Sequence, residues 1–227
     1  FVGNEVLLRR EMTGDTLAGL IRRVKAATGR PVLYADVPHF FKQEPAVVAA
    51  TDMLGVHILP YWDDPTPVSI DEVQAHVARI VANMQKTYPG KPLMIGEIGW
   101  PSAGRTRGGN VPSLVNQARF VREFALGAAR LGIGYNLIEA IDQPWKRLPE
   151  GTVGGYWGIF SADRVLKFPL TGPVSEWPRW RVAFGCSLAL MAVFLGYVLV
   201  LGRITGAVRL TAFGLLALAT GISLVHL

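Results

Sequence analysis

The chain has 227 residues, of which 50% are apolar and 18% are charged, and its formal net charge is +6. This composition excludes a disordered chain, because such chains lack the apolar surface that a core requires. A single cysteine excludes a disulfide framework and any zinc site built from several thiolates. The charge is unevenly distributed: residues 177–227 hold four arginines and no acidic residue, which leaves 19 basic and 17 acidic groups in residues 1–176. Nucleic-acid binding is therefore disfavoured, since it requires clustered basic contacts with phosphates.

Short apolar runs alternate with amphipathic stretches along the first three quarters of the chain. The predicted strands cover residues 1–6, 31–35, 53–59, 92–98 and 134–141. Helical spacing of apolar residues predicts helices over residues 13–28, 69–88 and 113–131. Thr13 or Asp15 is the expected cap of the first helix and Ser69 that of the second.

This alternation predicts a parallel sheet covered by helices. Five strands in about 175 residues correspond to the C-terminal half of a (β/α)8 TIM barrel, which has eight strands in about 250 residues. The alternative is an open doubly wound sheet. Its phosphate-binding loop is missing, because the nearest match, Gly151-x-x-Gly154-Gly155, neither follows a predicted strand nor opens a predicted helix.

The C-terminal tail has the composition of membrane spans. Residues 182–201 contain no charge over 20 positions, about the length that crosses a bilayer, and residues 210–227 form a second apolar run. A pair of buried helices in a soluble protein is the alternative. Arginines are equally frequent on both sides of the first run, so the orientation stays open.

The predicted fold class is therefore α/β: half of a TIM barrel followed by two transmembrane helices. The expected organisation is a catalytic domain over residues 1–171, a juxtamembrane linker over residues 172–181 and the two spans over residues 182–227. The chain begins without Met inside a predicted strand, so we expect a fragment that lacks the N-terminal strands. Such a half barrel is expected to be inactive and prone to aggregation by itself, because its strand edges are unpaired.

Two glutamates directly follow predicted apolar strands. Glu5 and Glu97 are 92 positions apart, which is about three βα units. Catalytic residues of barrel enzymes lie at the C-terminal ends of the strands. Two facing carboxylates, with aromatic side chains nearby, are the groups that glycoside hydrolysis requires. The alternative for each glutamate is a structural salt bridge.

The sequence resembles glycoside hydrolase family 17, the β-1,3-glucanase family. Residues 92–104, PLMIGEIGWPSAG, are similar to its nucleophile signature, and residues 2–5, VGNE, are similar to its acid/base strand. The resemblance implies a retaining mechanism with Glu97 as nucleophile and Glu5 as acid/base, while Asn4 contacts the sugar 2-hydroxyl. The mechanism then requires Glu5 to be protonated near neutral pH while Glu97 is ionised.

Further substrate-binding residues are expected around this pair. A hydrogen bond from His57 or Tyr61 would orient Glu97, although a buried core histidine is the alternative for His57. Gln143 and Lys146 follow the last predicted strand, where plant family members have a Glu and a Lys. The remaining candidates are sugar-stacking aromatic residues: Tyr61, Trp62, Trp100, Trp145 and Trp157. Glu139 is expected to pair with Lys146 or an arginine, and Asp36 with a sugar or an arginine.

The resemblance implies a β-glucan oligosaccharide or polysaccharide as partner and neither a cofactor nor a metal. The apolar tail adds a lipid bilayer and favours a membrane-anchored transglycosylase in β-(1,3)/(1,6)-glucan synthesis or remodelling, with a fused or associated glycosyltransferase. Bacterial members with membrane segments are the most similar, so we expect the bacterial inner membrane with the catalytic domain extracytoplasmic. The alternatives are a hydrolytic endo-β-1,3-glucanase and a non-catalytic membrane-tethered glucan-binding protein.

Overall fold

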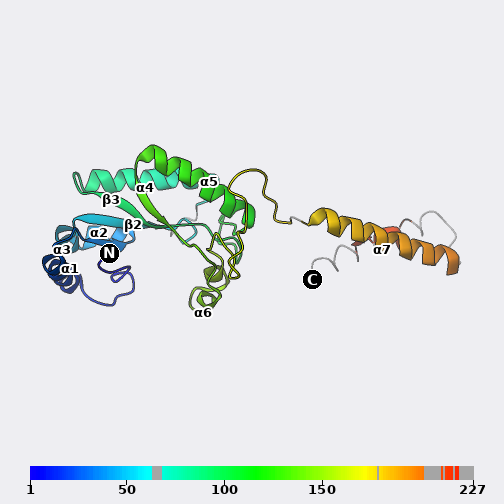
Figure 1. The fold of residues 1–227 in the computed structure, drawn as a ribbon, viewed down its shortest axis with the longest axis horizontal. Coiled ribbons are helices and arrows are strands. Elements are labelled where there is room, and N and C mark those ends of the chain that lie inside the picture. Colours follow the sequence, from blue (N-terminus) through cyan, green and yellow to red (C-terminus); the bar gives the residue numbers. More distant parts are fainter. Residues whose placement is uncertain (63–67, 178, 202–210, 212, 217, 220–227) are drawn as a thin grey trace. The chain divides into compact units, whose positions relative to one another are not determined.

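A computed structural model of the chain describes residues 1–62, 68–177, 179–201, 211, 213–216 and 218–219. The chain divides into two compact units, Phe1–Val174 and Ser175–Leu227. The first unit contains the sheet and its helices, and the described part of the second contains a long helix (Figure 1).

Four parallel strands form the sheet of the first unit. They are β1 (Leu33–Asp36), β2 (Met53–Ile58), β3 (Leu93–Ile98) and β4 (Gly134–Leu137), and they are paired in the order β1-β2-β3-β4. Spatial order that follows chain order is what consecutive βα units of a barrel produce, whereas doubly wound sheets reverse their order at a switch point. The predicted α/β class with a parallel sheet is confirmed. The last strand is predicted over residues 134–141, but it is shorter and ends at Leu137.

Helices connect the strands, and α4 and α5 lie side by side along the sheet (Figure 1). Short helices follow β4 instead of one long helix. The helices of the first unit are α1 (Gly14–Thr28), α2 (Pro38–Gln43), α3 (Pro45–Ala50), α4 (Val73–Thr87), α5 (Leu114–Leu131), η1 (Pro144–Lys146), α6 (Arg147–Glu150) and η2 (Thr152–Gly155).

Side-chain caps fix the ends of two helices where the sequence predicts them. Thr13 accepts a hydrogen bond from the backbone of α1 and Ser113 from that of α5, and each helix ends at a left-handed glycine, Gly29 or Gly132. The predicted start of α4 at Ser69 is wrong. The Ser69 hydroxyl donates to the Glu72 carboxylate at 3.1 Å instead of accepting from the backbone, and the helix begins four residues later, at Val73.

Residues 1–6 do not form the predicted strand. Gly3 and Glu5 have φ angles of 86° and 54°, in the left-handed region, so the segment cannot stay extended. It still lies beside β1, because Val2 N–H donates to Leu33 O at 2.7 Å and Glu5 N–H donates to Ala35 O at 2.9 Å. These bonds hold Glu5 near the C-terminal end of β1.

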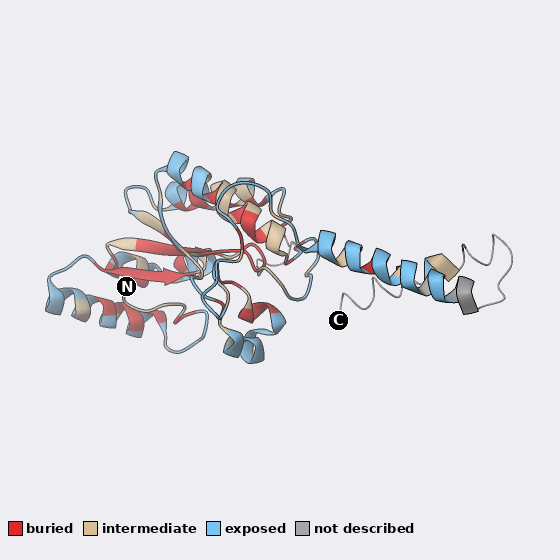
Figure 2. Cartoon of the chain, turned by 45° about the vertical axis from the view of Figure 1, so that its right-hand side comes forward, coloured by how far each residue is buried: buried red, intermediate tan, exposed pale blue. Residues whose placement is uncertain are grey.

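The core lies between the strands and the helix faces that cover them (Figure 2). Leu17 and Ile21 of α1, Val77 of α4 and Phe120 and Phe124 of α5 are almost completely buried. Leu17 and Ile21 are four positions apart, as are Phe120 and Phe124, and this spacing places each pair on one side of its helix. This packing fixes the strand ends on which the polar residues lie.

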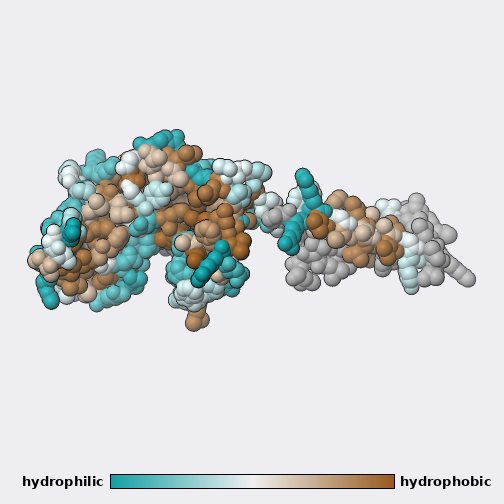
Figure 3. Space-filling model, in the orientation of Figure 1, coloured by the Kyte–Doolittle hydropathy of each residue, from teal (hydrophilic) through white to brown (hydrophobic). Residues whose placement is uncertain are grey.

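The second unit contains α7 (Trp180–Leu201), an apolar helix of 22 residues. Its segment Trp180–Tyr197 has a mean hydropathy of 1.5 and is only 6% buried, so α7 is long and apolar enough to cross a membrane. The face of α7 drawn in Figure 3 is largely hydrophobic. The second predicted span, residues 210–227, lies mostly outside the described residues, so two spans are not supported.

Candidate active site

A bulge between β2 and β3 brings His57 and Glu97 together at the C-terminal end of the sheet. Val56 pairs with Ile95, but the next residue, His57, pairs with Glu97, so β3 has one extra residue, Gly96. A Cβ atom at Gly96 would lie 2.6 Å from Cδ2 of His57. Only glycine therefore fits below the imidazole, and the bulge redirects Glu97, as bulges beside functional sites do.

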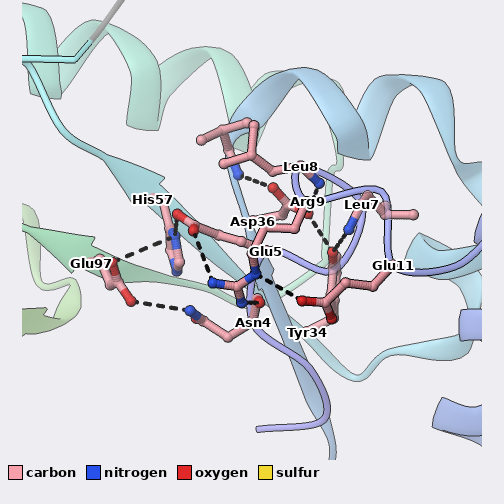
Figure 4. Close-up of polar contacts among 11 residues, drawn as sticks. Asn4, Glu5, Leu7, Leu8, Arg9, Glu11, Tyr34, Asp36, His57 and Glu97 are labelled. Carbon is pink, nitrogen blue, oxygen red and sulfur yellow. Dashed lines mark hydrogen bonds and ion pairs between the residues drawn. The ribbon is translucent and has the colours of Figure 1, made fainter. Parts of the chain in front are cut away.

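Glu5 and Glu97 face one another across this edge (Figure 4). One carboxylate oxygen of each lies within 4.8 Å of the other, and the Asn4 amide donates to Glu97 Oε1 at 3.3 Å. Retaining glycosidases hold their carboxyl groups about 5–5.5 Å apart, whereas inverting enzymes separate them by about 6.5–9.5 Å to admit a water molecule. The spacing here fits the retaining geometry.

His57 lies between the two carboxylates but is bonded to Glu5. Its Nδ1 is 2.9 Å from Glu5 Oε1 and 3.9 Å from Glu97 Oε2, and its side chain is completely buried. Tyr61 is also turned away from Glu97, since its hydroxyl donates to Arg105 O at 2.6 Å. The expectation that one of these residues donates a hydrogen bond to Glu97 is therefore wrong, because among the described residues Asn4 makes the side-chain hydrogen bond to Glu97, and His57 is 3.9 Å away.

The surroundings of Glu5 favour its ionised form. The hydrogen bond from His57 lowers the pKa of Glu5, burial opposes this, and the electrostatic contributions of His57, Arg9 and Lys146 lower the pKa further. Arg9 lies on the other side of the carboxylate, with Nη1 3.7 Å from Glu5 Oε2. These contacts disfavour the protonated Glu5 that the retaining mechanism requires near neutral pH.

Comparison with known proteins agrees with this geometry. Residues 1–158 match the family described as the BtgE/BtgC glycoside hydrolase domain. The chain belongs to this family. Its resemblance to glycoside hydrolase family 17 is confirmed as well, because family 17 proteins are among the similar solved structures.

The family 17 β-1,3-glucanosyltransferase from Rhizomucor miehei is 29% identical, with a TM-score of 0.66 over 76% of this chain and 63% of that chain. An active-site mutant of the Rhizomucor miehei enzyme, in complex with laminaritriose, is 28% identical, with a TM-score of 0.65 over 74% and 62% of the two chains. A glucan 1,3-beta-glucosidase from Candida albicans is 27% identical over 74% of this chain and 61% of its own length. The chain thus spans less than two thirds of these relatives.

Asp36 of this glycoside hydrolase domain is a structural residue. It is completely buried, and it accepts hydrogen bonds from the Tyr34 hydroxyl and from Val37 N–H, the latter at 2.8 Å. Burial raises the pKa of Asp36. The Tyr34 hydroxyl also accepts from Leu7 N–H at 3.0 Å. Asp36 therefore anchors the segment after Glu5, and the expected partner, a sugar or an arginine, is wrong.

The predicted aromatic residues separate into two groups. Trp100 is only 1% exposed and stacks on Phe120, so its predicted role as a sugar platform is wrong. Tyr61 and Trp157 are also buried. Trp62 is 36% exposed and stacks on Trp157, and Trp145 is 71% exposed, so both are accessible to a ligand.

Gln143 and Lys146 both contact Glu139. The Gln143 amide donates to Glu139 Oε2, and Lys146 Nζ lies 2.8 Å from the same oxygen, which confirms the expected pair of Glu139 and Lys146. The other oxygen of Glu139 is buried and has no hydrogen-bond partner in the structure as described. From the sequence, Glu139 is predicted only as an ion-pair partner, and Arg9, which lies beside Glu5, is not predicted as a site neighbour. A carboxylate inside an apolar run was the available signal for Glu139.

Glu5, His57 and Glu97 also have the spacing of a possible metal site. One ligand atom of each lies within 4.8 Å of the others. The same proximity is expected of a retaining carboxylate pair with a hydrogen-bonding neighbour, and the family match concerns a glycoside hydrolase domain.

Proposed function

We propose that the chain is the C-terminal half of a (β/α)8 barrel enzyme that acts on β-glucan by a retaining mechanism. The observation that carries this proposal is the close pair of carboxylates, Glu5 and Glu97, at the C-terminal edge of a parallel sheet. In this role Glu97 is the nucleophile and Glu5 is the acid/base. Relatives that are a β-1,3-glucanosyltransferase and a glucan 1,3-beta-glucosidase support the substrate class.

In the first step, Glu97 attacks the anomeric carbon and forms a covalent glycosyl ester. The bond from that carbon to the leaving oxygen breaks, and protonated Glu5 gives its proton to this oxygen. The Asn4 amide donates to Glu97, and contact with the sugar 2-hydroxyl is its proposed role during catalysis. Accessible Trp62 and Trp145 are the proposed stacking residues, and Gln143 and Lys146 are proposed to contact sugar hydroxyls beside Glu139.

In the second step, ionised Glu5 removes a proton from the incoming hydroxyl as its oxygen attacks the glycosyl ester. Glu97 leaves as a carboxylate, and Glu5 is again protonated. The incoming hydroxyl belongs to a second sugar in transglycosylation and to water in hydrolysis. We favour transglycosylation, because the Rhizomucor miehei relatives are glucanosyltransferases and because a membrane-bound enzyme suits glucan synthesis or remodelling.

The test uses the full-length protein with laminari-oligosaccharides of defined length and resolves the products by size. Products longer than the substrate indicate transfer, and shorter products alone indicate the hydrolytic endo-β-1,3-glucanase. Complete absence of turnover in the intact protein would contradict both and favour a glucan-binding protein. Glu97→Gln is the matched inactive control, since it keeps the size and polarity of the side chain.

The proposed domain organisation adds a membrane anchor to this enzyme. Residues 1–171 are the catalytic domain, residues 172–181 the linker, and residues 182–227 the membrane segment that includes most of α7. The proposed location is the bacterial inner membrane with the catalytic domain extracytoplasmic, next to a fused or associated glycosyltransferase. Alkaline carbonate extraction tests the anchor: the protein should stay with the membrane, and release into the supernatant would contradict it. Protease added to intact spheroplasts should cleave the catalytic domain.

A further inference from the structure

We propose that His57 is a positioning residue for the acid/base. In this role its Nδ1–H holds Oε1 of Glu5, so that the proton given to the leaving oxygen is carried on Oε2. The inference rests on the proposed function and deepens it, because it specifies which oxygen of Glu5 carries out the proton transfer.

The two nitrogens of the imidazole have different surroundings. Nδ1 lies 2.9 Å from Glu5 Oε1, whereas Nε2 is buried and has no hydrogen-bond partner among the described residues. An orphaned buried N–H is rarer in proteins than an unpaired acceptor. The tautomer with hydrogen on Nδ1 therefore fits the site, because it donates to Glu5 and leaves only a lone pair at Nε2.

Gly96 keeps the ring in this position. A Cβ atom there would lie 2.6 Å from Cδ2 and 2.9 Å from Nε2 of His57, so any side chain would displace the ring. The bulge at Gly96 also pairs His57 with Glu97, which lets the ring approach both carboxylates. The sequence thus provides both the imidazole and the space that it occupies.

The hydrogen bond from His57 leaves one oxygen of Glu5 for catalysis. A proton on Oε1 would meet the Nδ1–H directly, so the carboxyl proton is placed on Oε2. Arg9 lies 3.7 Å from Oε2, and its side chain is 50% exposed, so it can turn toward solvent when a sugar enters. Oε1 of Glu5 then accepts the orienting hydrogen bond from His57, and Oε2 carries the proton that is transferred.

Other charged groups act on Glu5 from the elements packed around it. His57 on β2 makes the shortest contact with the carboxylate, and its hydrogen bond is the largest cause of the lowered pKa of Glu5. The remaining groups are Arg9 on the same segment, Asp36 on β1, Glu97 on β3, Lys146 in η1 and Glu150 in α6, and Lys146 is itself paired with Glu139 after β4. Removal of His57 should therefore raise the pKa of Glu5.

The test compares His57→Ala with His57→Asn in the full-length protein in detergent. The asparagine amide nitrogen occupies roughly the place of Nδ1, so it retains a donor that does not titrate. The titration midpoint of Glu5 is followed by 13C NMR of labelled glutamate carboxyls, with Glu5→Gln to assign the signal. We expect the midpoint to move to higher pH in His57→Ala and to stay near the wild-type value in His57→Asn.

Kinetics on laminari-oligosaccharides provide a second readout. We expect kcat to fall about 10- to 100-fold in His57→Ala, in the range of lost second-layer contacts, with a smaller change in KM. The alkaline limb of the pH profile should move upward together with the NMR midpoint. His57→Asn should recover most of the lost kcat. His39→Ala, at an exposed position on α2, is the matched control.

A midpoint of Glu5 that is the same in wild type and His57→Ala would overturn the inference, as would a His57→Asn midpoint equal to that of His57→Ala. Gly96→Ala checks the geometry without removal of a polar group, and it should move the midpoint in the same direction as His57→Ala. If the wild-type protein forms no product, the proposed function fails, while the NMR titration still decides the role of His57.

Discussion

Two carboxylate sites of the first unit have opposite designs. Glu5 and Glu97 place oxygen atoms within 4.8 Å of each other, and both remain partly exposed. Asp142, by contrast, forms a buried ion pair with Lys167 at 2.9 Å and accepts from Gly158 N–H at 2.8 Å. One site brings like charges together, and the other neutralises a charge completely.

This difference links the Glu5–Glu97 pair to function and the Asp142–Lys167 pair to stability. Like charges at this distance repel, so the rest of the fold must hold Glu5 and Glu97 together. Asp142 and Lys167 hold neighbouring loops instead, because the Lys167 ammonium also donates to the Ser102 hydroxyl at 2.7 Å. A change in the first pair should therefore affect activity, and a change in the second should affect unfolding.

The largest expected effect is on activity at Glu97. Glu97→Gln should reduce turnover of laminari-oligosaccharides at least about a thousand-fold, because it removes the proposed nucleophile. It should leave the thermal unfolding midpoint unchanged or higher, since it removes one of two like charges. Calorimetry measures the unfolding midpoint and product analysis measures the turnover, both on the same preparation. A clear fall of the midpoint would show that Glu97 is also a structural residue.

The opposite result is expected at Asp142. Asp142→Ala leaves the Lys167 ammonium buried without its counter-ion, which should lower the free energy of unfolding by about 3 kcal/mol. Burial already lowers the pKa of Lys167, so loss of Asp142 lowers it further. Denaturant unfolding measures the loss. The double variant Asp142→Leu/Lys167→Met should recover much of the lost unfolding free energy. Equal losses in the single and the double variant would contradict the ion-pair explanation.

A smaller loss of stability is expected at Tyr34, beside the second structural carboxylate. Tyr34→Phe removes a donor to Asp36 and an acceptor for Leu7 N–H, both in the interior. The expected loss is about 1–2 kcal/mol of unfolding free energy. The segment after Glu5 is tied down by these bonds, so its amides should exchange with deuterium faster. Unchanged exchange at Leu7 would contradict this role.

The smallest effect concerns the pH dependence of Glu5. In the proposed mechanism, general acid catalysis by Glu5 is lost as the pH rises through its pKa. The neighbours of Glu5 lower this pKa from its ordinary value, so the optimum should be acidic. Arg9→Gln removes one positive charge and should move the alkaline limb of kcat/KM slightly upward, because Arg9 is half exposed and screened. An alkaline limb of kcat/KM that moves to lower pH in Arg9→Gln would contradict the contact between Arg9 and Oε2 of Glu5.

Local sequence signals predict most of the helices and strands. Thr13 and Gly29 bound α1, and Ser113 and Gly132 bound α5, because caps and left-handed glycines act within a few residues. The first segment is different. Its apolar pattern predicts a strand, but backbone angles at Gly3 and Glu5 end the extended conformation, and no sequence pattern shows such angles at a glutamate.

The sequence by itself determined the parallel α/β class, the two glutamates at the sheet edge and the acid-free tail, because periodicity, motif and charge are local properties. Only the tertiary structure decided that His57 bonds Glu5, that Trp100 belongs to the core and that Gln143 contacts Glu139. Each depends on a side chain that meets a residue at least four positions away. The bulge at Gly96 gives the physical reason: one extra residue in β3 changes which side chains face each other.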